Sequence, residues 1–180
     1  MTSDKTQTIC RRLVGDGYIY AELAKVPEPY KTELMDLSSD IYLYGGVGVG
    51  KTYAMAAVIK ELVVSGHNVK RINFDDFCCK VRASMNSESK LSEYDLVTEL
   101  VNCDVLFIDD VGLRSKQETD FAYVTFYTIL NKRQEKLLPT FVTSNKSIQR
   151  LSETFDIRIS SRLSLGSVIE MKGHDRRINK

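Results

Sequence analysis

Eight consecutive residues from Gly45 to Thr52 have the types and order that phosphate binding requires. They read Gly45-Gly46-Val47-Gly48-Val49-Gly50-Lys51-Thr52 and fit the pattern G-x-x-x-x-G-K-[ST]. The glycines let backbone N–H groups close around phosphate oxygens with no side chain in the way. Lys51 is expected to reach the β- and γ-phosphates, and the Thr52 hydroxyl to bind Mg²⁺. The loop therefore predicts a site for ATP and Mg²⁺, and a flexible turn is the weaker alternative.

Two carboxylates, Asp109 and Asp110, directly follow the apolar run 105–108. If that run is a buried strand, both lie at its C-terminal end, where open α/β sheets collect their ligands. Asp109 is then expected to hold Mg²⁺, directly or through water. Asp110 is placed to orient or deprotonate the water that attacks the γ-phosphate. The plainer alternative is that Asp110-Val111-Gly112 is only a turn.

The elements that must position these residues follow from the order of apolar segments, which alternate between strand and helix patterns. Strands are expected at 40–44, 69–74, 105–108, 139–143 and 168–171, and the longer helices at 51–64, 91–102 and 117–132. Asp75 and Asp76 suit the N-cap of a helix after the second strand better than a substrate-binding pair of a small-molecule kinase. Five strands separated by helices predict a parallel α/β sheet.

Later motifs resemble those of AAA+ ATPases. Thr143-Ser144-Asn145 resembles the sensor-1 motif, which makes Asn145 the polar residue that contacts the γ-phosphate or the attacking water. The run 156–163 resembles the segment whose arginine faces a neighbouring subunit's nucleotide. Arg162 matches that arginine finger, and Arg158 matches it less directly. The alternatives are a strand-to-helix cap for the first motif and a solvated basic helix face for the second.

Within the AAA+ proteins, the sequence resembles the DnaC, DnaI and IstB group of helicase loaders and transposition helpers. The resemblance rests on D-D-V-G at 109–112, T-S-N at 143–145, R-x-x-x-R-L at 158–163 and the G-x-x-x-R ending at 173–177. Forty-four residues precede Gly45, fewer than the group's loaders carry, which indicates either a compact phage-like or mobile-element-like form or a truncated chain.

The resemblance implies a three-layer P-loop NTPase fold of the AAA+ type with a five-stranded parallel sheet. Eighteen residues follow Arg162, so no C-terminal helical lid is expected. Residues 1–39 form an N-terminal extension or linker, and residues 40–180 form the ATPase domain. The implied catalytic set, which includes one arginine that acts in a neighbouring subunit, is Lys51, Asp109, Asp110, Asn145 and Arg162.

The function implied by this resemblance is ATP binding and hydrolysis by a replicative-helicase loader that assembles as an ATP-dependent homo-oligomer on single-stranded DNA. Asp110 stands where related ATPases usually have glutamate, so slow turnover stimulated by a partner or by DNA is expected. Three alternatives stay open: a transposition helper that binds duplex DNA, a nucleotide-binding interaction module with little hydrolysis, and a P-loop kinase.

Composition limits the remaining possibilities. The 25 basic and 24 acidic side chains nearly cancel, so any nucleic-acid surface must be a local patch. The sequence contains neither a signal-peptide pattern nor an apolar run long enough to span a membrane, which predicts a cytoplasmic protein without a membrane partner. The four cysteines lack CxxC spacing, so free thiols are expected.

Overall fold

The computed structural model describes residues 3–86, 92–112, 120–154 and 157–176, and its core is one five-stranded sheet. The strands are β1 Ile41–Tyr44, β2 Val69–Asn73, β3 Val105–Val111, β4 Thr140–Ser144 and β5 Ser167–Glu170. They lie in the order β2-β3-β4-β1-β5, and every neighbouring pair is parallel. The predicted five-stranded parallel α/β sheet is confirmed.

Eight α-helices and two short 3-10 helices are found among the described residues. They are α1 Ser3–Val14, η1 Asp16–Tyr18, η2 Leu23–Lys25, α2 Tyr30–Leu34, α3 Lys51–Val64, α4 Phe74–Ser84, α5 Glu93–Val101, α6 Asp120–Glu135, α7 Ile148–Thr154 and α8 Ile157–Leu163. The helix predicted at 51–64 is confirmed at both ends. The predicted helix starts at Leu91 and Gln117 lie outside the described residues, as does Arg177 of the G-x-x-x-R ending.

The prediction that Asp75 and Asp76 cap α4 is wrong. The N-cap is Asn73, whose side-chain oxygen accepts a hydrogen bond of 2.9 Å from the backbone N–H of Asp75. The helix begins at Phe74, directly after β2, so the sequence-based strand 69–74 was one residue too long. The two carboxylates instead lie in the first helical turn, where the helix dipole favours negative charge.

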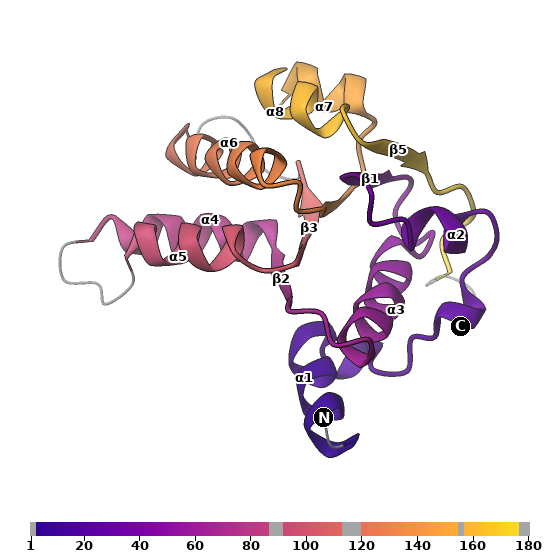
Figure 1. Ribbon diagram of the computed structural model, residues 1–180. Helices are drawn as coiled ribbons and strands as arrows, with labels where there is room; N and C mark the ends of the chain where they lie inside the picture. The colour runs from indigo at the N-terminus through magenta and orange to yellow at the C-terminus, as the bar shows by residue number, and fades with distance from the viewer. Residues whose placement is uncertain (1–2, 87–91, 113–119, 155–156, 177–180) are drawn as a thin grey trace.

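Alternating side chains on the strands produce three layers. Ile41, Leu43 and Phe107 point to one face, where they share a core with α1, α2 and α3. Tyr42 and Leu106 point to the other face, toward a core built with α4, α5, α6, α7 and α8. Successive residues of a strand face opposite sides of the sheet, so these apolar strands are buried on both faces. Figure 1 shows α1 and α3 on one side of the sheet and α4, α5 and α6 on the other.

The insertion of β4 between β1 and β3 decides which loops meet at the C-terminal edge of the sheet. The glycine-rich loop leaves β1, Asp109 and Asp110 lie just before Val111 at the end of β3, and Asn145 directly follows β4 between them. The structure describes no helix between the end of β5 and residue 176.

The segment that precedes β1 lies against α3. Lys60 of α3 donates hydrogen bonds to the carbonyls of Ile19 at 2.6 Å and Ala21 at 2.7 Å. The hydroxyl of Tyr53, also on α3, accepts a bond of 3.2 Å from the N–H of Glu22. α3 therefore fixes the path of residues 19–22. None of the helices that the structure describes is long and apolar enough to cross a membrane.

Candidate nucleotide-binding site

The glycine-rich loop lines an open pocket of about 850 Å³ at the C-terminal edge of the sheet. Seven of the predicted site residues line this pocket, among them Lys51, Thr52, Asp110 and Asn145. Val47, Gly48 and Gly50 complete the wall on the loop side. The sequence therefore identified residues that lie far apart in the chain and come together in space.

The loop turns sharply at two glycines. Gly48 has φ of 73° and Gly50 has φ of 109°, a backbone region that residues other than glycine rarely adopt. Gly48 is also crowded, because a β-carbon there would lie 1.8 Å from a carboxylate oxygen of Asp175. The backbone N–H of Arg176 donates a 3.1 Å hydrogen bond to the Gly48 carbonyl. The tail after β5 therefore returns to the loop, and Arg176 joins the pocket wall.

Lys51 is the first residue of α3 and is held inside the loop. Its ammonium group donates to the carbonyls of Gly45 at 2.9 Å and Gly46 at 2.8 Å, and to Oδ1 of Asn145 at 2.7 Å. All three acceptors are neutral, and only 6% of Lys51 is exposed. A phosphate oxygen can take over such bonds with a gain in charge attraction, because hydrogen bonds between ionised partners are the stronger ones. The contact with Asn145 links the loop to the sensor-like strand end.

Asp109 lies next to Thr52 in the arrangement expected for a magnesium site. Oδ1 of Asp109 lies 3.4 Å from the Thr52 hydroxyl, which donates to it. Asp109 is only 2% exposed. A hydroxyl and a carboxylate are oxygen ligands of the kind that Mg²⁺ prefers beside substrate phosphates. The donor set therefore fits Mg²⁺ bound with a nucleotide.

Thr143 is the first residue of the predicted T-S-N motif, and the structure gives its side chain a role that the motif did not assign to it. Its hydroxyl donates to Oδ1 of Asp109 and accepts a 2.9 Å hydrogen bond from the N–H of Asp110. Asp110 has φ of 60°, and the β3–β4 pairing shifts register between Ile108 and Val111. Such a bulge re-aims a side chain, and here Asp110 lines the pocket while Asp109 is buried. The signal in the sequence was the position of Thr143 in the same T-S-N motif as Asn145, at the C-terminal end of β4.

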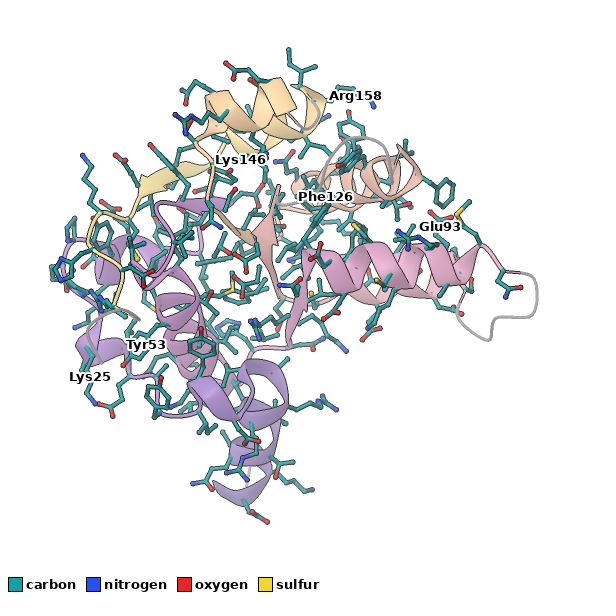
Figure 2. All side chains as sticks on the ribbon, turned by 180° about the vertical axis from the view of Figure 1, so that it is seen from behind. Lys25, Tyr53, Glu93, Phe126, Lys146 and Arg158 are labelled. Atoms are coloured by element: carbon teal, nitrogen blue, oxygen red, sulfur yellow. The ribbon has the colours of Figure 1, made fainter. Side chains whose placement is uncertain are left out.

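A second group missed by the motif analysis comes from the N-terminal segment. Gly17, Tyr18, Tyr20 and Lys25 line the pocket, together with Tyr53 of α3. The rings of Tyr20 and Tyr53 lie 6.1 Å apart between centroids. Figure 2 shows Lys25 and Tyr53 on the same side of the molecule. Lys25 donates a 3.0 Å hydrogen bond to the Glu22 carboxylate, and this pairing raises the pKa of the Lys25 ammonium.

Arg162 does not line this pocket. It lines another, of about 410 Å³, together with Asp40, Pro139 and Gly166, which precede β1, β4 and β5 and so mark the opposite edge of the sheet. Its guanidinium donates to the Gln134 side chain at 3.3 Å and lies 5.6 Å from the ring centre of Tyr127. Arg158 lies over the same ring at 5.5 Å. Figure 2 shows Arg158 far from Tyr53 and Lys25.

Comparison with known proteins gives a consistent result. The family model described as the bacterial DnaA ATPase domain matches residues 32–170. The chain is 28% identical over 123 residues to the replicative helicase loader DnaC of Escherichia coli strain K12, which covers 68% of this chain and 49% of DnaC. It is 30% identical over 115 residues to the replicative helicase loader DnaI of Bacillus subtilis strain 168, which covers 64% of this chain and 36% of DnaI.

A solved structure of DnaI has the same fold. It superposes with a TM-score of 0.73 at 24% identity and covers 93% of each chain. The alignments to the curated relatives DnaC and DnaI span about half of their length or less.

Proposed function

This chain belongs to the bacterial DnaA ATPase domain family, and we propose that it is an ATP-binding and hydrolysing AAA+ protein that acts in DNA replication as a replicative-helicase loader. The observation that carries the ATPase part is the convergence of Lys51, Thr52, Asp110 and Asn145 on one pocket. The loader part is supported by the names of the relatives in Escherichia coli and Bacillus subtilis.

In this proposal the glycine-rich loop and Lys51 bind the phosphates of ATP. Lys51 exchanges its hydrogen bonds to neutral oxygens for bonds to phosphate, which releases the Asn145 amide to contact the γ-phosphate or the attacking water. Thr52 and Asp109 would hold Mg²⁺, which supplies charge neutralisation at the phosphates. Asp110 orients the water for in-line attack, a positioning task more than a covalent one.

The adenine base of ATP is proposed to lie against the pocket wall made by the N-terminal segment. Tyr18, Tyr20 and Tyr53 offer aromatic surface there, and Lys60 fixes the carbonyls on either side of Tyr20. An aromatic wall suits a purine ring, because both faces of the ring are apolar and polarisable.

Turnover is proposed to be slow and stimulated by a partner. Asp110 is one methylene shorter than glutamate, and its backbone is fixed by Thr143.

A neighbouring copy is proposed to supply Arg162 to the nucleotide, because Arg162 lies at the opposite sheet edge from Lys51 within one chain. Assembly around single-stranded DNA is the proposed setting in which copies meet in this way.

The test is an affinity pull-down from the native host with an Asp110→Asn variant in ATP and Mg²⁺. Asparagine tolerates the left-handed backbone of residue 110, and it removes the charge that orients the water. The matched control is Lys51→Ala, which removes the phosphate contact. We expect a hexameric replicative helicase with Asp110→Asn and not with Lys51→Ala. A transposase in its place contradicts the loader assignment, and equal helicase recovery with both variants contradicts the proposed ATP dependence of helicase binding.

A further inference from the structure

One cation next to the candidate magnesium site has no role in the mechanism above. Arg71 lies on β2, the strand next to β3, and its Nη2 donates to Oδ2 of Asp109 at 2.7 Å. Its Nη1 donates to the backbone carbonyl of Leu13 at 3.1 Å. The Arg71 side chain is 20% exposed and that of Asp109 is 2% exposed. Arg71 therefore connects the carboxylate to α1, which ends at Val14.

The two oxygens of Asp109 have different partners. Oδ1 accepts from Thr143 and Thr52 on the nucleotide side, whereas Oδ2 is paired with Arg71. A carboxylate this deeply buried needs a compensating positive charge, and Arg71 supplies it. A divalent cation at Thr52 and Asp109 would bring a second positive charge to the same carboxylate. Two cations at hydrogen-bonding distance from one buried group repel each other and compete for it.

We propose that Arg71 is a positioning residue that acts as the counter-ion of Asp109 and gives way to Mg²⁺ when MgATP binds, so that metal binding is linked to the end of α1. This inference rests on the nucleotide site of the proposed function. When Arg71 releases Asp109, its guanidinium keeps one fixed partner, the carbonyl of Leu13, and the last turn of α1 loses a firm anchor. Linkage makes the effect reciprocal, so a change that fixes this turn weakens the binding of MgATP.

The inference predicts opposite effects of Arg71 on nucleotide binding with and without metal. With Mg²⁺ present, Arg71 competes, so its removal strengthens ATP binding. Without Mg²⁺, Arg71 is a nearby positive charge that offsets Asp109 and the phosphates, so its removal weakens ATP binding. A merely structural role of Arg71 would change both affinities in the same direction and leave their ratio unaltered.

The experiment is calorimetric titration of the full chain with ATP in Mg²⁺ and in EDTA. Arg71→Gln removes the charge and keeps a polar side chain with a hydrogen-bond donor. Lys70→Gln is the matched control, because Lys70 is the adjacent β2 residue and pairs with Glu99 instead. The quantity to compare is the dissociation constant of ATP in EDTA divided by that in Mg²⁺. We expect this ratio to be at least about five-fold higher for Arg71→Gln than for the wild-type chain, which is the lower end of usual coupling between sites. Lys70→Gln should leave the ratio at the wild-type value.

A ratio that stays constant or falls in Arg71→Gln overturns the inference, because Arg71 would then only support the fold or the bound metal. If the wild-type chain binds no ATP in either condition, the proposed nucleotide site fails first, so the two failures are distinguishable. A second variant covers the case in which Arg71→Gln does not fold. Arg71→Lys keeps the charge but has a single nitrogen in place of the two that bridge Asp109 and Leu13.

Hydrogen exchange of the α1 end is the second measurement. The N–H of Gly15 donates to the carbonyl of Arg11 at 2.9 Å and reports on this turn. In the wild-type chain, MgATP should speed exchange of the amides at residues 11–15 at least about five-fold. In Arg71→Lys that acceleration should vanish. Unchanged exchange in the wild-type chain on MgATP binding rules out the link to α1.

Discussion

Replacing Thr143 with valine should disable the site while leaving its shape intact. The side chain is 1% exposed, and its hydroxyl both donates to Asp109 and accepts from the N–H of Asp110. Valine fills nearly the same volume but has no hydroxyl, so the substitution removes both hydrogen bonds and creates almost no cavity. The Asp110 N–H then has no acceptor in Thr143, and Asp109 loses one of its donors.

The cost follows from the partners that are left behind. A hydrogen bond to a charged group is worth about 1.5–3 kcal/mol, and an unsatisfied buried N–H costs about 1–3 kcal/mol. The two are not fully additive because one hydroxyl makes both bonds, so we expect a loss of about 3 kcal/mol in the free energy of unfolding. The loss of Asp110 positioning should lower kcat more than it raises KM, by about 10- to 100-fold in kcat.

Urea unfolding and steady-state ATP hydrolysis measure the two effects. Thr143→Ser is the matched variant, because it keeps the hydroxyl and loses only a methyl group. We expect Thr143→Ser to keep most of the stability and most of kcat. A Thr143→Val protein within about 1 kcal/mol of wild type, with unchanged kcat, would refute the role assigned to this hydroxyl, since such a change is within the usual range for single substitutions.

Three further predictions concern other parts of the molecule. Arg162→Ala and Lys51→Ala should each abolish stimulated hydrolysis. A mixture of the two variants should recover part of it, because a site formed by Lys51 of one copy and Arg162 of the other keeps both groups. If a turnover assay shows no recovery, Arg162 acts within its own chain. Gly48→Ala should weaken ATP binding at least about ten-fold in titrations, because residue 48 has positive φ and faces Asp175. Burial raises the pKa of the Cys103 thiol, so iodoacetamide at pH 8 should label exposed Cys79 in the native chain and reach Cys103 only in denaturant, as mass mapping will show.

Local sequence patterns predicted most of the helices and strands. The glycine run, the helix at 51–64 and the alternation of apolar segments are properties of neighbouring residues, so they could be predicted without knowledge of tertiary contacts. The end of β2 was misjudged for a local reason of another kind. Asn73 and Asp75 are both acceptable N-cap residues. The helix begins before Asp75 because Phe74 is buried in the core as its first residue, which makes Asn73 the N-cap.

The contacts that complete the site depend on strand order, which no local pattern specifies. Thr143 meets Asp109 and Asp110 only because β4 lies beside β3 and the pairing shifts at that point. Arg71 reaches Asp109 only because β2 is the next strand outward. Tyr18 and Tyr20 reach the pocket through the packing of residues 19–22 on α3. Arg71, Tyr18 and Tyr20 belong to no motif, and the contact between Thr143 and Asp109 can be identified only when distant segments are paired.

The positions of Lys51 and Arg162 constrain any account of how the site works. Lys51 lies where β1 ends, and Arg162 lies beside the residues that precede β1, β4 and β5. The same chain cannot bring both to one phosphate without unfolding the sheet between them. Arg162 therefore either serves its own chain through Gln134 and Tyr127, or serves a second copy. Gln134 and Tyr127 are both neutral, and the guanidinium is half-buried in the second pocket, beside an open surface. An anion brought by another copy would therefore meet a positive charge that these two contacts do not neutralise.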